Sequence, residues 1–141
     1  MNIVELKYKV KERPGNPFAG PDDVYHALKP YFNPIQEELF IVPTVAQECV
    51  VEKVFVGGLD ASTIDLRTIF HKLLVQYPNC NAFLIAHNHP SGDVEPSYND
   101  LYVTRKVKEA AKLLGYHFLD HLIFSNKAYY SLKEHNLLEG K

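Results

Sequence analysis

The segment that most constrains the fold is a short apolar run at residues 82–86, which contains no polar or charged side chain. A run of this length and composition is typical of a strand that is covered on both faces. Pro78 precedes it, and a polar segment with two prolines and a glycine follows at residues 88–96. Such residues predict a loop. The sequence therefore predicts a central strand of a covered sheet, ending in a polar loop.

The residues after this loop predict a long helix over 97–114. Ser97 and Asp100 have the spacing of a capping box, and Gly115 is placed to end the helix. Pro43 cannot donate a ladder hydrogen bond, so its strand end is expected at an edge or a bulge. Similar patterns predict strands at 3–10, 38–42, 50–56, 116–124 and 128–130. They also predict a helix at 22–31, capped by Asp22, and a helix at 62–77 that begins at Ser62 or Thr63. A last short helix is expected after Ser131, where Glu134 completes a second capping box. This order predicts one mixed sheet with helices packed on it.

Composition narrows the classes of protein that fit. With 141 residues and a formal net charge of -2, the chain has the size of one domain and lacks the basic excess of a dedicated DNA-binding module. Cys49 and Cys80 form no C-x-x-C pair, which favours two free thiols in a reducing compartment. No run approaches the roughly 20 apolar residues of a membrane span, and residues 1–10 do not resemble a secretory signal. We therefore expect a cytoplasmic protein without a membrane partner.

Three side chains around the loop predict a metal site. His87 and His89 lie two residues apart at the end of the apolar strand, so both rings are expected on one face. Asp100, in the first turn of the next helix, can return to this pair. Two nitrogens and one carboxylate leave a fourth position open, as in catalytic zinc sites. Two simpler interpretations stay open: surface histidines in a loop, and an aspartate that only caps its helix.

The order His87-x-His89-Pro90, six residues, then Ser97-x-x-Asp100 resembles the signature of the JAB/MPN metalloprotein family in its JAMM form. More narrowly, residues 87–93 and 95–97 are similar to the RadC branch, named for a bacterial DNA-repair protein. Further segments similar to that branch are Leu119-Asp120-His121, Tyr129-Tyr130-Ser131 and Arg67. The resemblance covers roughly residues 21–131. It divides the chain into an N-terminal strand and loop extension, 1–20, and a RadC-like JAB/MPN domain, 21–141.

The resemblance implies an α/β (α+β) fold of the JAB/MPN type, a cytidine-deaminase-like mixed β-sheet flanked by helices. It implies one Zn²⁺ per chain held by His87, His89 and Asp100, although iron or manganese would also suit this donor set. Ser97 is then expected to support the activated water or the oxyanion, and a glutamate on an earlier strand to act as general base. Glu38 matches that glutamate best because it begins a strand.

Several site assignments remain open from sequence. Glu37 has the opposite strand parity to Glu38, so only one of them can face the metal, and Glu38 could instead be a solvated carboxylate. Asp120 and His121 either support the metal ligands from behind or are strand residues satisfied by the fold.

The implied reaction is peptide or isopeptide hydrolysis. Glu38 would take a proton from a water molecule activated by zinc, and Ser97 would stabilise the charge that develops on the attacked carbonyl. The expected partner is a peptide or protein substrate, and the oligomeric state stays open.

Two other functions compete with this one. The first is a nucleic-acid-associated module in DNA repair or mobile-element biology, with a metal not used for proteolysis. Its support is a locally basic helix containing Arg105, Lys106, Lys108 and Lys112, and charged helix faces are usually just solvated. The chain has no room for the helix-hairpin-helix region that longer RadC-type proteins resemble, which lowers this expectation. The second is a non-catalytic protein-interaction domain, against which the complete ligand set argues.

Overall fold

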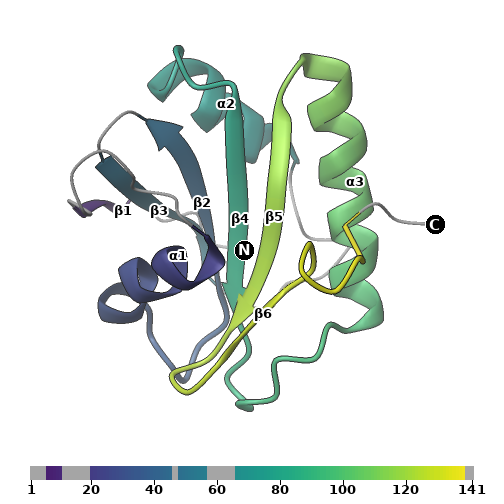
Figure 1. Cartoon of the computed structure of the whole chain (residues 1–141). Coiled ribbons are helices and arrows are strands. Elements are labelled where there is room, and N and C mark those ends of the chain that lie inside the picture. Colours follow the sequence, from purple (N-terminus) through teal and green to yellow (C-terminus); the bar gives the residue numbers. More distant parts are fainter. Residues whose placement is uncertain (1–5, 11–19, 46–47, 57–65, 139–141) are drawn as a thin grey trace.

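The structure, a computed structural model, describes residues 6–10, 20–45, 48–56 and 66–138 (Figure 1). Its elements are β1 (Leu6–Val10), α1 (Pro21–Leu28) with a following 3-10 turn (Lys29–Tyr31), β2 (Glu38–Val45), β3 (Glu48–Val56), α2 (Leu66–Gln76), β4 (Ala82–Asn88), α3 (Tyr98–Leu114), β5 (His117–Phe124) and β6 (Tyr129–Ser131). In this part of the chain no helix is both long and apolar enough to cross a bilayer.

The strands form one six-stranded mixed sheet in the order β1-β3-β2-β4-β5-β6. Only β4 and β5 run parallel among the described strands, and α3 makes the crossover between them. All other neighbouring pairs are antiparallel. The mixed α/β architecture predicted from the sequence is confirmed, and it is consistent with a JAB/MPN-like fold.

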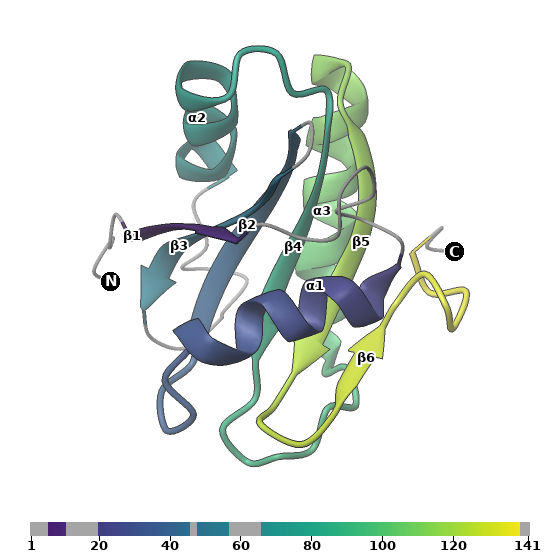
Figure 2. The ribbon, with the colours of Figure 1, turned by 60° about the vertical axis from the view of Figure 1, so that its left-hand side comes forward.

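Helices cover both faces of the sheet, as Figure 2 shows, with α1 on one side and α2 and α3 on the other. Side chains of β4 alternate between the two resulting cores. Phe83 and Ile85 pack with residues of α2 and α3, whereas Leu84 and Ala86 pack with residues of α1. Full burial of a side chain such as Phe83 stabilises the fold by roughly 1.5–3 kcal/mol. The prediction of a strand covered on both faces is confirmed.

Helix α3 begins and ends as the sequence predicts. The Ser97 hydroxyl accepts a hydrogen bond from the Asp100 amide, and the Asp100 carboxylate accepts one from the Ser97 amide. At the other end Gly115 adopts φ 85°, a left-handed conformation that glycine reaches without steric cost. The capping box matters beyond stability, because it fixes where the Asp100 carboxylate lies.

Three local predictions are wrong. Helix α1 begins at Pro21 with Gly20 as its N-cap, so Asp22 lies inside the first turn instead of capping it. Pro43 was expected at an edge or a bulge, but it lies in β2, an internal strand, opposite Phe83 of β4. The pairing of β2 with β3 passes from Ile41–Glu52 to Thr44–Cys49, and the bulge in this ladder lies between Leu39 and Phe40. Residues 132–138, the described part after Ser131, form turns where a helix was expected, although the Ser131 hydroxyl accepts the Glu134 amide as a capping serine would.

Some predictions fall outside the described residues. These are the start of the first strand, residues 11–19 of the predicted strand and loop extension, and the helix opening at Ser62 or Thr63. Cys80 is a buried free thiol, in line with its predicted state, and the side chain of Cys49 lies outside the description.

Candidate metal centre

His87 and His89 lie at the end of β4, on the face that carries α3. His87 continues the parity of Phe83 and Ile85 and is fully buried, whereas the side chain of His89, just past the strand end, is 17% exposed. Their Nε2 atoms are 3.1 Å apart. The predicted convergence of the two rings is therefore present in the structure, with one ring in the core and the other at the surface.

Asp100 completes the arrangement from α3. Its Oδ1 lies 3.0 Å from Nε2 of His87, and its Oδ2 lies 3.1 Å from Nε2 of His89. The Ser97 amide also donates to Oδ2, at 2.7 Å, so the capping box aims the carboxylate at the histidines. The capping and ligand interpretations of Asp100 are thus compatible in one geometry.

These spacings fit a metal ion. Two ligand atoms at ~2.0–2.1 Å from a tetrahedral zinc ion are about 3.3 Å apart. The two histidine Nε2 atoms are 3.1 Å apart, and each lies 3.0–3.1 Å from a different oxygen of the Asp100 carboxylate, so an outward shift of a few tenths of an ångström would accommodate the ion. Two imidazole nitrogens and a carboxylate are also a donor set that zinc prefers.

The electrostatics of the cluster favour a cation at this point. Burial opposes ionisation of Asp100, but hydrogen bonds from His87 and His89 outweigh it and lower the pKa of the carboxyl. The hydrogen bond with Asp100 raises the pKa of His89 above its usual value, against the effect of burial. A carboxylate that stays charged and a histidine that holds its proton indicate a position where positive charge is stabilised.

Glu37, rather than Glu38, reaches the histidines. A carboxylate oxygen of Glu37 and one ring nitrogen each from His87 and His89 all lie within 4.8 Å of one another. The Glu38 carboxylate instead accepts hydrogen bonds from Lys53 Nζ and from the Asn33 amide, both at 2.9 Å, and the side chain is 3% exposed. The preference for Glu38 is thus corrected: its charge is neutralised inside the sheet.

Asn88 explains how Glu37 comes to this place, and sequence reasoning missed it. Asn88 is the residue between the two histidines in the sequence, and its side chain is buried. The Glu38 amide donates to Asn88 Oδ1 at 2.7 Å, and Nδ2 donates to the Gln36 carbonyl at 2.8 Å. These bonds tie the segment before β2 to the end of β4, with Glu37 between the two anchored positions. The only signal in the sequence is an amide inside the His-x-His pair.

His121 contacts the back of His87, whereas Asp120 does not take part. His121 Nε2 lies 2.8 Å from His87 Nδ1, and the ring is fully buried. Burial is the main cause that lowers the pKa of His121, followed by the nearby His87. Asp120 accepts hydrogen bonds from the Ser131 hydroxyl and from the His121 and Lys133 amides. It therefore holds the turn after β6 against β5.

The model of the RadC-like JAB domain family matches residues 18–137. The chain belongs to the RadC-like JAB domain family. This match includes Glu37, Asp100 and His121, whose side chains lie against the histidine pair.

Several relatives share the name UPF0758 protein. A UPF0758 protein of Alkaliphilus oremlandii is 34% identical over 134 residues, which are 93% of this chain and 53% of the relative. A UPF0758 protein of Methanosarcina acetivorans is 37% identical over 126 residues, covering 87% of this chain and 54% of the relative. The RadC-like chain thus spans about half the length of the curated relatives it matches. Their names state no activity, and the JAB fold is compatible with a metal-dependent hydrolase.

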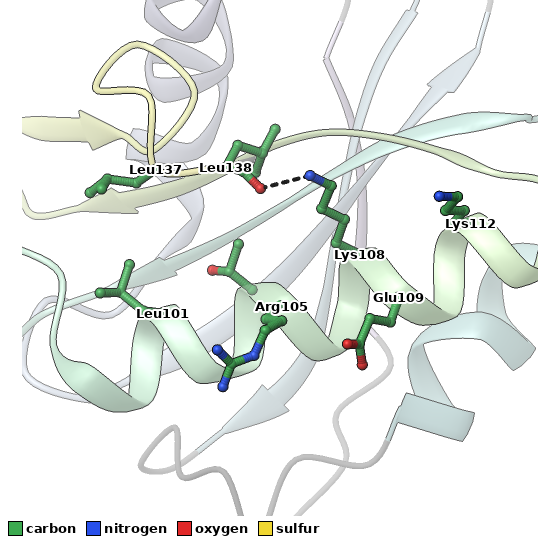
Figure 3. A pocket seen from close by; sticks show the side chains of 8 residues that line it. Leu101, Arg105, Lys108, Glu109, Lys112, Leu137 and Leu138 are labelled. Carbon is green, nitrogen blue, oxygen red and sulfur yellow. Dashed lines mark hydrogen bonds between the residues drawn. The ribbon is translucent and has the colours of Figure 1, made fainter. Parts of the chain in front are cut away.

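A concave surface of this RadC-like domain lies beside α3. Its volume is about 250 Å³. Figure 3 shows the side chains that line it, from that helix and from Leu137 and Leu138. Its lining mixes cations, leucines and one glutamate: Leu101, Thr104, Arg105, Lys108, Glu109, Lys112, Leu137 and Leu138. Lys108 donates to the Leu138 carbonyl at 3.2 Å, and Arg105 lies over the Tyr102 ring. Part of the basic side of α3 is therefore engaged within the domain, and nucleic-acid binding stays a prediction.

Proposed function

We propose that this domain is a metal-dependent hydrolase that cleaves peptide or isopeptide bonds. The observation that carries the proposal is the convergence of His87 Nε2, His89 Nε2 and the Asp100 carboxylate at 3.0–3.1 Å. These three groups would hold a zinc ion. When bound, the ion supplies Lewis acidity and makes a water molecule acidic enough to ionise near neutral pH.

Glu37 is the group that would move the proton. It is half-buried and within reach of both histidines, which suits a carboxylate that accepts a proton from water and returns it to the departing amine. In this hydrolysis the water oxygen bonds to the carbonyl carbon, the C–N bond breaks, and the amine leaves with the proton. Glu38 would have no part in it, because Lys53 and Asn33 occupy its oxygens.

Ser97 would stabilise the charge that develops on the carbonyl oxygen. Its oxygen accepts the Asp100 amide hydrogen at 3.1 Å, which leaves the hydroxyl proton to be donated elsewhere. The residue is exposed at the start of α3, so a substrate can reach it. A preorganised donor of this kind contributes about 10²–10³-fold to the rate in other hydrolases.

The two neighbouring glutamates provide the sharpest test. Purified protein with its metal would be incubated with a proteome-derived peptide library and with peptides joined through a lysine side-chain amide, and new termini would be identified by mass spectrometry. We expect Glu37→Gln to keep its zinc and to lose roughly 10²–10⁴-fold in rate, the usual contribution of a general base.

Glu38→Gln is the matched control, one residue away and identical in chemistry. We expect it to retain the cleavage rate at a temperature where circular dichroism shows it folded. Cleavage that survives Glu37→Gln but is lost in Glu38→Gln would return the base to Glu38. No cleavage of either substrate class by the zinc-loaded wild-type protein would reject the proposed activity.

A further inference from the structure

We infer that Thr104 and His121 are positioning residues that fix the tautomer of His87, so that its Nε2 presents a lone pair to the metal. The inference rests on the proposed metal site and adds two residues, from α3 and β5, behind it. They form a continuous chain with His87: His87 Nδ1 to His121 Nε2 at 2.8 Å, and His121 Nδ1 to Thr104 Oγ1 at 2.6 Å.

The direction of each hydrogen bond follows from the end of this chain. Thr104 Oγ1 lies 2.7 Å from the backbone carbonyl oxygen of Asp100, one helical turn earlier. A carbonyl oxygen can only accept, so the single hydroxyl proton of Thr104 is donated to it. The Thr104 oxygen must then accept from His121, which places a proton on Nδ1 of His121.

The direction of these hydrogen bonds also determines which nitrogen of His87 donates. His121 is fully buried and Thr104 is 2% exposed, and a buried imidazole without a carboxylate partner avoids the cost of a charge by staying neutral. A neutral ring with its proton on Nδ1 has an accepting Nε2. His87 must therefore donate from its own Nδ1. Its Nε2, which lies 3.0 Å from Asp100 Oδ1, is then the nitrogen left to bind the metal once the metal displaces the proton shared with Asp100.

His89 reaches the same tautomer by a shorter route. Its Nδ1 lies 2.8 Å from the Asp93 backbone carbonyl, which again can only accept. Both ligand histidines are thus oriented by backbone carbonyls, His89 directly and His87 through two buried side chains. The carbonyl at the end of the longer chain belongs to Asp100, so the chain also links two of the three ligands to each other.

Magnetic resonance on histidine-labelled protein tests this assignment directly, with or without metal. Long-range proton–nitrogen spectra report which ring nitrogen carries the proton, and a nitrogen–nitrogen coupling between His87 and His121 reports the bond that joins them. We expect His121 to be neutral, protonated on Nδ1 and accepting at Nε2. A proton on Nε2 of His121, or a doubly protonated His121, would overturn the inference.

Zinc affinity of paired variants provides the second readout. We expect His121→Leu to weaken zinc binding by about 10–100-fold, the usual effect of removing a group that orients a metal ligand. His121→Gln, whose amide oxygen can accept from His87, should recover part of this loss. Thr104→Val should weaken binding about fivefold, the value of one hydrogen bond, and Thr104→Ser should restore it.

The outcomes separate this inference from the proposed function. Unchanged affinity in both His121→Leu and Thr104→Val, each verified as folded, would overturn the inference while the metal site stands. A wild-type protein that binds no zinc would reject the metal site, and the spectra of His121 would still decide the tautomer.

Discussion

Glu38 and Asp100 are both buried carboxylates, exposed by 3% and 2%, yet they have different partners. Glu38 meets Lys53, an ammonium group from the neighbouring strand, at 2.9 Å. Asp100 meets two imidazole nitrogens at 3.0 and 3.1 Å. In the first cluster the charge of Glu38 is neutralised by Lys53, a side chain of the same protein. The second brings two imidazoles against one carboxylate, and these three groups can hold a metal cation when it displaces the protons between them.

The contrast explains why adjacent glutamates have different roles. Glu38 lies within the regular pairing of β2, on the face where Phe40 packs against α1. Glu37 precedes the strand, in a segment held by Asn88. A carboxylate inside the sheet is costly unless paired. The half-buried carboxylate of Glu37 lies instead at the strand end, within reach of the two histidines.

Removing the cation of the first pair should have the largest effect. Lys53→Met leaves Glu38 buried without its countercharge, and such a loss typically costs about 3–5 kcal/mol of folding stability. Denaturant unfolding of the metal-free protein measures it. Adding Glu38→Gln to Lys53→Met should recover much of the loss, and a single variant within about 1 kcal/mol of wild type would show that the pair is not a structural ion pair.

Metal binding at the second cluster should depend on pH. The folded pKa of His89 is raised above 6.5, so its protonated form stabilises the metal-free fold below about pH 6.5, and this contribution is lost as pH rises through the folded pKa. A metal must displace that proton. Zinc affinity should therefore increase with pH across this range, by up to about tenfold per pH unit for one proton.

Calorimetry in buffers of different ionisation enthalpy counts the protons released on zinc binding. At least part of one proton per zinc is expected just below neutral pH, and less at higher pH where His89 is already neutral. A constant affinity from about pH 6 to pH 8 would show that no histidine in the cluster gives up a proton to the metal.

The smallest effect concerns the cap that orients Asp100. Ser97→Ala removes the acceptor of the Asp100 amide but keeps the backbone bond from residue 97 to the carboxylate. We expect a loss of about 1 kcal/mol in stability with zinc affinity nearly unchanged. Ser97→Asp, a good N-cap, should restore stability; a large loss of zinc affinity in Ser97→Ala would show that capping and ligation are not separable.

Local patterns in the sequence predicted the elements that hold the ligands. The apolar run of β4 and the capping box of α3 are short-range signals, and they place His87, His89 and Asp100 without further information. The sequence indicated that only one of Glu37 and Glu38 faces the ligands, which the structure bears out, but the choice of Glu38 was wrong. Glu37 precedes the strand, and its position depends on Asn88, a contact across 50 residues. The contact of Thr104 with His121 is likewise made only by the packing of α3 on β5.

Two wrong predictions show the same limit. Ser131 and Glu134 have the spacing of a capping box, but the Ser131 hydroxyl donates to Asp120 and the following residues form turns. Pro43 suggested an edge, yet β2 is internal and its ladder with β3 accommodates the proline between two paired positions. In both places a tertiary contact overrides a local preference.

The most direct test of the central claim is elemental analysis of native protein beside Asp100→Asn and Lys53→Met. Asn keeps an oxygen that can accept the Ser97 amide, so the cap survives while the charge is removed. We predict about one zinc per chain in the wild type, none in Asp100→Asn, and retained zinc in folded Lys53→Met. No zinc in the wild type after refolding with the metal, or equal zinc in Asp100→Asn, would contradict the account.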